Sequence, residues 1–152
     1  MTNSTYYFGN FNDQTFTHNC CIFKMDTIMK KLREIVYKTL VDNFNISPSL
    51  LSRIEGDEPI AIELKGGEEI FVYLQKGALQ TFIEIPLCDQ RMLRNKSPKI
   101  IESLMSDDEV FFSIKKEKLI FLTEFSADVT DVERKLADKL ILFNNMVSYI
   151  KS

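Results

Sequence analysis

Residues 59–87 read PIAIELKGGEEIFVYLQKGALQTFIEIPL, and this stretch decides the fold. Apolar and other side chains alternate in three runs, residues 59–65, 69–74 and 79–87, which is the period of a β-strand. Gly66, Gly67 and Gly77 stand between the runs and tolerate the positive φ of tight turns. Because the links are short, consecutive strands are expected to pair as an antiparallel meander.

A second hairpin is expected nearer the C-terminus. Residues 110–114 and 119–125 are apolar runs of strand length, and the polar residues 115–118 between them suit a turn. These two strands complete the predicted antiparallel sheet.

Helices are predicted on both sides of these strands. Apolar residues at i, i+3, i+4 and i+7 predict a first helix over residues 25–41. Ser47-Pro48 and Ser97-Pro98 pair an N-cap residue with a proline suited to the first helical position. They predict a short helix over residues 48–54 and a middle helix of about two turns, which ends at residues 106–109. Thr130 and Glu133 match a capping box that opens a long final helix.

The order of elements places the chain in the α+β class. We expect a three-strand meander plus a hairpin in one antiparallel sheet, with N-terminal, middle and C-terminal helices. Residues 25–152 form a single domain in this interpretation, and residues 1–24 are an N-terminal extension with few charges and many aromatic residues. Either Met25 is the true initiator, or the extension is real and covers a binding groove in cis.

Composition excludes several classes of function. The chain has 152 residues, with 19 Lys and Arg against 22 Asp and Glu, for a net charge of −3. It lacks the basic surface expected of a protein that binds nucleic acid. No apolar window is long enough for a membrane span, and residues 1–24 do not resemble a secretory signal. We therefore expect a cytoplasmic protein.

No recognisable catalytic or metal-binding motif is present. His18 is the one histidine and lies near Cys20 and Cys21, but adjacent cysteines rarely bind one ion, and we interpret these residues and Cys88 as a loop histidine and reduced thiols. Gly66-Gly67 lies between two strands, so a hairpin is favoured over a phosphate-binding loop. We predict no enzyme, no metal and no cofactor.

Two further features have alternative interpretations. Asp107, Asp108 and Glu109 could bind a divalent cation, but the spacing of a calcium loop is absent, and a solvated turn is favoured. The predicted strands carry apolar residues on both faces: Ile70, Val72 and Leu74 alternate with Phe71 and Tyr73. Either both faces are covered within the monomer, or one face meets a second subunit or a client segment. The small number of predicted helices leaves both alternatives open.

The order of elements over residues 25–152 resembles the class I chaperones of type III secretion systems. Residues 46–54, ISPSLLSRI, followed by the strand IAIEL at residues 60–64, look like the InvB/SpaK subfamily. The resemblance implies a homodimer in the bacterial cytoplasm that binds the extended N-terminal segment of a secreted effector and keeps it secretion-competent. It also implies the secretion ATPase as a further partner. No reaction is involved.

By element position, the resemblance also implies two surfaces. The effector-binding residues are expected to be Ile35, Val36, Phe71, Tyr73 and Phe82. The dimer interface is expected to contain Ile100, Ile101, Leu104, Met105, Phe111 and Phe112.

Two other functions remain open from the sequence. One is a regulatory interaction module similar to YbjN, which would bind no effector segment. The other is a small thioesterase of the hot-dog type, whose sheet would wrap around one long helix.

Overall fold

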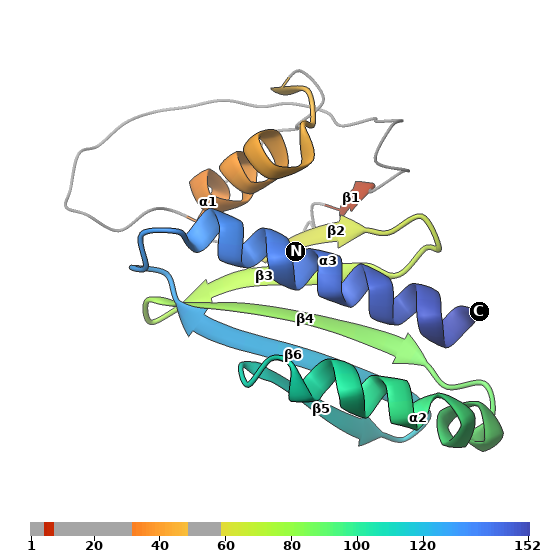
Figure 1. The fold of residues 1–152 in the computed structure, drawn as a ribbon. Coiled ribbons are helices and arrows are strands. Elements are labelled where there is room, and N and C mark those ends of the chain that lie inside the picture. Colours follow the sequence, from red (N-terminus) through yellow and green to blue (C-terminus); the bar gives the residue numbers. More distant parts are fainter. Residues whose placement is uncertain (1–4, 8–31, 49–58) are drawn as a thin grey trace.

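The computed structural model describes residues 5–7, 32–48 and 59–152 (Figure 1). Its elements in chain order are β1 (Thr5–Tyr7), α1 (Leu32–Lys38), a π-helical turn (Thr39–Asn43), β2 (Ile60–Glu63), β3 (Glu69–Gln75), β4 (Ala78–Pro86), α2 (Gln90–Met105), β5 (Val110–Lys115), β6 (Lys118–Ser126) and α3 (Val132–Lys151).

The strands form one sheet in the order β1-β2-β3-β4-β6-β5. The meander β2-β3-β4 and the hairpin β5-β6 are both antiparallel, and they meet where β4 pairs with β6. β1 is the exception, because it pairs with β2 in parallel. The predicted α+β class and both predicted strand groups are confirmed.

Two tight turns account for the register of the meander. Gly67 has a φ of 87° in the turn between β2 and β3, and Lys76 and Gly77 have φ values of 51° and 79° between β3 and β4. Two consecutive positive φ values are typical of the two-residue turn that matches the twist of paired strands. Gln75 therefore pairs directly with Ala78, and the pairing continues without interruption to Ile70 and Ile83.

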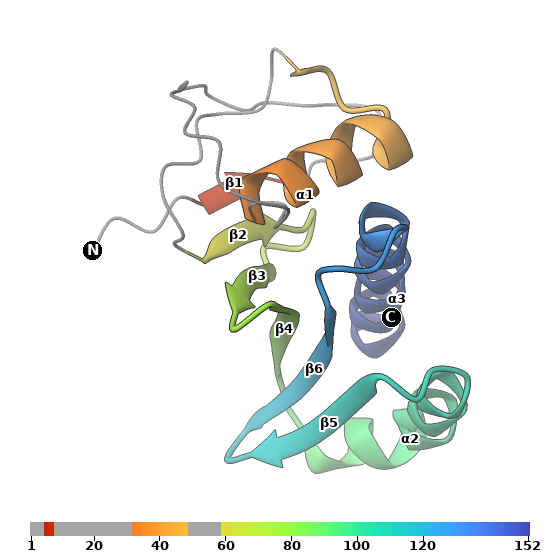
Figure 2. The same cartoon turned by 90° about the vertical axis from the view of Figure 1, so that its left-hand side faces the viewer.

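The three described α-helices lie on the same side of the sheet (Figure 2). Alternate residues of each central strand face these helices and are buried, as Ile83 on β4 and Phe121 on β6 are. Phe143 of α3 packs beside the ring of Phe121, with centroids 6.3 Å apart. The core therefore lies between one face of the sheet and the helices, and the opposite face has no described helix over it.

The middle helix differs from the prediction at its start. α2 begins at Gln90, where the carboxylate of Asp89 accepts a hydrogen bond from the backbone N–H of Arg91 at 2.9 Å. Pro98 thus lies inside the helix and leaves the carbonyl of Arg94 without its usual donor. The hydroxyl of Ser97 donates to that carbonyl at 3.2 Å, which explains how the proline is accommodated.

The predictions for the other helices are confirmed only in part. Leu32–Lys38 falls within the predicted first helix, and the π-helical turn continues to Asn43, beyond the predicted end at residue 41. Residues 25–31 and nearly all of the predicted short helix lie outside the described residues. Asp131 is the N-cap residue of α3, and its side chain makes no capping hydrogen bond. The prediction that Thr130 is the N-cap residue is therefore wrong. With the cap at Asp131, Glu133 occupies the second helical position rather than the third, where the reciprocal bond forms.

Candidate functional site

A row of apolar side chains crosses the face of the sheet that no described helix covers. Phe71 pairs with Phe82, Phe82 pairs with Leu122, and Leu122 pairs with Phe111. Cross-strand partners place their side chains on the same face of a sheet. We call these four residues of β3, β4, β6 and β5 the outer row.

Ring contacts order one end of the outer row. The rings of Phe71 and Phe82 stack with centroids 4.9 Å apart, and Tyr73 meets Phe82 edge-on at 6.0 Å. All three are half-buried, so the rings shield one another and still keep exposed surface. The structure therefore brings together the three sheet residues that the sequence assigned to effector binding.

The two helical residues assigned to effector binding lie elsewhere. Ile35 and Val36 on α1 are both 0% exposed and belong to the hydrophobic core. The periodicity of a helix identifies its apolar stripe, but a stripe packs inward whenever a sheet face is available to it. Neither residue is therefore available to a partner at the surface of the described structure.

A second apolar surface is formed by α2 and β5. Seven large hydrophobic side chains are exposed among the described residues, and five of them come from these two consecutive elements. We call the five the α2–β5 patch: Ile101, Met105, Phe111, Phe112 and Ile114. Phe111 belongs to the outer row as well, whereas Phe112 and Ile114 pair with the buried residues Phe121 and Leu119 and so lie on the helix-bearing side of β5. The α2–β5 patch therefore includes residues from both faces of this edge strand.

Most of the residues predicted for the dimer interface are found in this patch. Met105 is 82% exposed, and Phe111 and Phe112 are 59% and 48% exposed. Ile100 is the exception, since it is buried in the core, and Leu104 is partly buried against the core. The sequence analysis did not assign Ile114 or Leu122 to a surface, although alternation along their strands could have identified both.

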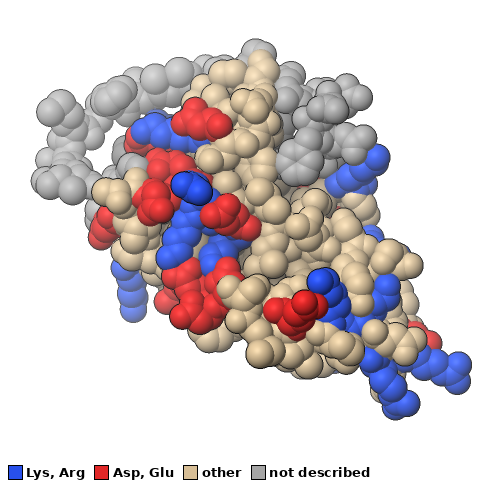
Figure 3. Space-filling model, in the orientation of Figure 1, with Lys and Arg blue, Asp and Glu red and all other residues tan. Residues whose placement is uncertain are grey.

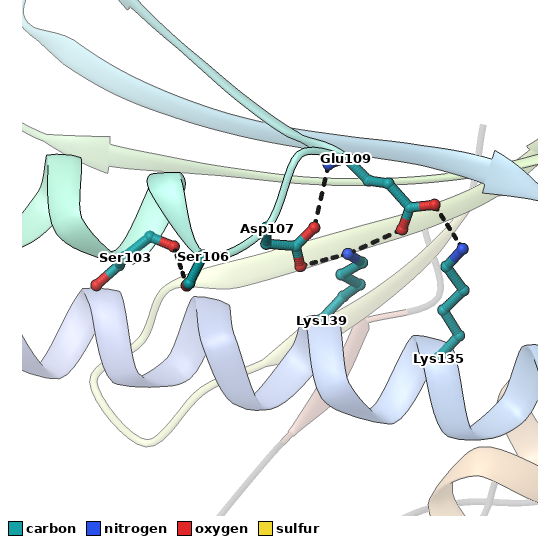
Figure 4. Close-up of polar contacts among 6 residues, drawn as sticks. All are labelled: Ser103, Ser106, Asp107, Glu109, Lys135 and Lys139. Atoms are coloured by element: carbon teal, nitrogen blue, oxygen red, sulfur yellow. Dashed lines mark hydrogen bonds and ion pairs between the residues drawn. The ribbon is translucent and has the colours of Figure 1, made fainter.

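Ion pairs hold the turn between α2 and β5 on α3 (Figure 4). The side chain of Lys139 is only 5% exposed; it pairs with Asp107 and lies 3.0 Å from Glu109. Lys135, one helical turn earlier, lies 2.5 Å from the other oxygen of Glu109. The predicted turn between the helix and the strand is present, but Asp107 and Glu109 are only partly exposed in it, because lysines distant in the sequence pair with them.

The environment of Glu109 changes its acidity. Partial burial raises the pKa of this carboxyl group, but hydrogen bonds from Lys135 and Lys139 outweigh that effect, so the pKa is lowered from 4.5. The network joins the side chains of Asp107 and Glu109 to those of Lys135 and Lys139. It therefore fixes the base of β5 and presents the α2–β5 patch on a rigid support.

α2 also contacts the C-terminal end of α3. The ammonium group of Lys96 donates to the carbonyl of Tyr149 at 2.9 Å and lies 4.7 Å above the ring of the same residue. Together with the Lys139 network, this contact ties α2 and β5 to α3 at two separated points. The elements that carry the α2–β5 patch are thus fixed to the rest of the domain through α3.

The remaining predictions about chemistry fall on other parts of the chain. His18, Cys20 and Cys21 lie outside the described residues, whereas Cys88 is an exposed free thiol. Across the described ranges, no group of three His, Cys, Asp or Glu side chains could hold a metal ion. Within the same ranges, no helix combines the length and apolar character needed to cross a bilayer.

Charges on the helix-bearing face are mixed in sign. Figure 3 shows acidic and basic side chains next to one another over the coloured part of that face. The Lys38–Glu34 pair, with nitrogen and oxygen 2.8 Å apart, is one exposed example. Of the two surfaces described above, neither owes its character to charge, since both are defined by apolar side chains.

Comparison with known proteins finds the same fold in solved chains. One is a chain of the ExsC–ExsE complex, with a TM-score of 0.52, 11% identity, and coverage of 80% of this chain and 96% of that chain. Another is a chain of the HopA1–SchA chaperone–effector complex, with a TM-score of 0.51, 5% identity, and coverage of 80% and 94%. YbjN from E. coli gives 0.44 at 12% identity over 82% and 91%, which is too low to support an argument.

The sequence itself matches no protein-family model and no curated protein. The similarity to the solved chains therefore lies in the arrangement of helices and strands and not in the sequence. A sheet in which β2 to β6 are antiparallel and β1 is parallel to β2, with the three described α-helices on one side, does not fit the hot-dog alternative, which requires a sheet wrapped around a single long helix. The chain has the fold seen in chains of the ExsC–ExsE complex and of the HopA1–SchA chaperone–effector complex.

Proposed function

We propose that this protein is a homodimeric type III secretion chaperone that acts in the cytoplasm without catalysis or a cofactor. It binds the non-globular N-terminal segment of one or more effectors and keeps that segment stable and secretion-competent. The family resemblance in the sequence and the shared fold both support this proposal.

The observation that carries the proposal is the outer row. Four apolar side chains from four neighbouring strands face away from the described helices, and two of their rings stack on each other. Contiguous exposed apolar surface of this kind marks interaction sites in soluble proteins. A client segment that adopts an extended or helical form there can bury its apolar side chains without having a core of its own.

The second surface supports the homodimer. Met105 and Ile101 on α2 and Phe112 and Ile114 on β5 are all exposed. The two elements lie at the same end of the sheet (Figures 1 and 2). Among the described strands, β5 pairs with β6 alone and leaves its outer edge open. Two copies related by a twofold axis would bury the same patch on each other, as a closed symmetric interface requires.

Co-expression with N-terminal fragments of secreted proteins encoded beside its gene tests the proposal. We expect the purified complex to contain two copies of the chaperone and the fragment, as measured by light scattering. Phe82→Glu should abolish retention, because it places a charge in the middle of the outer row. Ile141→Glu on α3 is the matched control, since Ile141 is exposed but lies outside both surfaces.

The outcomes separate the possible functions. Loss of the fragment in Phe82→Glu but not in Ile141→Glu would support binding at the outer row. A protein that retains no fragment would contradict the chaperone function and favour a regulatory module. Retention that is equal in all three proteins would contradict the location of the site.

A further inference from the structure

One edge of the sheet is occupied by a segment from the far N-terminus of the chain. Thr5, Tyr6 and Tyr7 form β1, which pairs with Ala61, Ile62 and Glu63 of β2, respectively. β1 is the end strand in the order of the described strands, and it is the one that runs parallel to its neighbour. Without β1, the outer edge of β2 would present unpaired N–H and C=O groups.

The pairing of β1 is much shorter than the others in the sheet. β1 has three residues, whereas β3 has seven and β4 has nine. A three-residue strand forms few hydrogen bonds, and it must also close the long chain segment between Tyr7 and Ile60. Short edge pairings of this kind open more readily than the body of a domain.

The strand that receives β1 is firmly held. Ile60 and Ile62 on β2 are each 1% exposed and belong to the hydrophobic core, and Ala61 is 2% exposed. β2 also pairs along its whole length with β3. The edge of β2 therefore keeps its position when β1 detaches, as a preformed binding site must.

The edge of β2 also continues the outer row. Ala61 pairs with Phe71, which is the first residue of that row. A residue that pairs with Ala61 at the free edge of β2 therefore extends the same cross-strand row of paired positions. In this structure that residue is Thr5. An extended client can pair its backbone with β2 and pass directly onto the outer row.

The resemblance to type III secretion chaperones already implies that a client adds a strand to an exposed edge of the sheet. We propose that in this protein residues Thr5–Tyr7 are a built-in competitor for that binding: they occupy the edge of β2 in the free chain, in parallel orientation, and an extended client must displace them. This inference rests on the proposed function for the identity of the client. Addition of a strand to a sheet edge is an established way to bind extended peptides. Here the chain's own segment fills the site, and a client must displace it.

Proline substitutions in the full chain test the occupancy of the edge. Consecutive N–H groups of a strand point to opposite sides, so one of Tyr6→Pro and Tyr7→Pro removes a hydrogen bond to β2. We expect hydrogen exchange of the β2 amides that do not pair with β3 to accelerate by roughly tenfold or more in that variant. Exchange in α3 should stay unchanged, and Asn3→Pro, outside β1, is the control. Unchanged exchange of β2 in both variants would overturn the inference.

A peptide probe tests the site without any effector. A synthetic peptide of residues 1–10 is added at millimolar concentration to the isotope-labelled full chains, and the amide signals of β2 are followed by NMR. We expect the signals of Ile60 to Glu63 to shift in the proline variant that has lost protection and to stay in place in the unmodified chain. No shift in any protein, or an equal shift in all, would overturn the inference.

These readouts are independent of the proposed function. If the peptide binds the proline variant but no effector fragment is ever retained, the strand-binding site holds and the chaperone function fails. If a fragment is retained equally well by the proline variants and the unmodified chain, the chaperone function holds and competition at β2 fails.

Discussion

Thr81 on β4 and Thr123 on β6 lie directly opposite each other, and both are fully buried. Neither hydroxyl group has a hydrogen-bond partner among the described residues. A buried hydroxyl without a partner loses its hydration and gains nothing in exchange. The two central strands therefore carry a polar pair at a position where apolar side chains of the same shape would fit.

Thr81→Val or Thr123→Val should leave the fold intact and stabilise the protein by up to about 1–3 kcal/mol. The physical reason is that the substitution removes an unpaired polar group with little change in volume. Urea unfolding at pH 7 measures the change. Thr39→Val is the matched control, because the Thr39 hydroxyl donates to the carbonyl of Ile35 at 2.7 Å. The control should be destabilised by about 1 kcal/mol, and a similar loss in the Thr81 variant would contradict the prediction.

Lys139→Met should destabilise the protein by roughly 1.5–3 kcal/mol, as is typical for lost hydrogen bonds to charged groups. The substitution leaves Asp107 and Glu109 without their shared buried cation, although Lys135 still pairs with Glu109. Urea unfolding gives the loss. Lys38→Met, which removes an exposed pair with Glu34, should leave stability unchanged. Equal stability of the two variants would show that the buried network contributes nothing.

Acid should weaken the attachment of β5 to α3. The pKa of Glu109 in the folded protein lies below its ordinary value of 4.5. The stabilisation from this group is therefore fully present above that ordinary value and is lost as the pH falls through the folded pKa. Unfolding curves from pH 7 to pH 3 should show Glu109→Gln losing less stability over the acidic range than the unmodified protein. Parallel curves would rule out Glu109 as the titrating group.

Met105→Glu should convert the dimer to a monomer with a mass near 17.7 kDa by light scattering. A charge buried in an apolar interface has no partner and loses its hydration. Met105 is a better position than Leu104, where Leu104→Glu would also disturb packing within the monomer. Ile141→Glu, on the exposed side of α3, should remain dimeric. A dimer that survives Met105→Glu would place the interface elsewhere.

Pro98→Ala should stabilise the protein by about 1–2 kcal/mol. Alanine is about 3 kcal/mol more favourable than proline inside a helix, and the greater freedom of the unfolded chain offsets part of this gain. The restored N–H can donate to the carbonyl of Arg94, which now accepts a hydrogen bond from the Ser97 hydroxyl at 3.2 Å. Thermal unfolding measures the shift, and a lower melting temperature would mean that Pro98 fits a necessary bend.

The strands could be predicted from the sequence because their signal is local. Alternation over β3 and β4, with glycine between them, fixes both the strand period and the turn. The start of α2 could not be predicted in the same way. Its first seven residues, QRMLRNK, include only Met92 and Leu93 as apolar side chains, while Ser97-Pro98 offers a stronger local start signal in the middle of the helix.

The candidate site was predictable only where it depends on strand geometry. Phe71 and Tyr73 are two residues apart on β3, so they must share a face. Whether Ile35 and Val36 face a client or the core depends on how α1 packs on the sheet, and no local pattern reports this. The Lys139 network was missed for a related reason, because its partners are separated by some thirty positions in the chain.

Among the described strands, one edge of the sheet is filled by the chain's own segment β1, and the other edge, on β5, has no partner strand. This arrangement sets a limit on the growth of an assembly. If two copies join through their β5 edges, both of these edges are paired and no open edge remains for a third copy. The assembly therefore closes as a dimer. If β1 leaves β2 and no client binds, each copy presents its β2 edge unpaired. The β2 edges at the two ends of one dimer can then pair with those of other dimers and form a chain of unlimited length. If the protein works as proposed, the three residues of β1 would also prevent polymerisation while no client is bound.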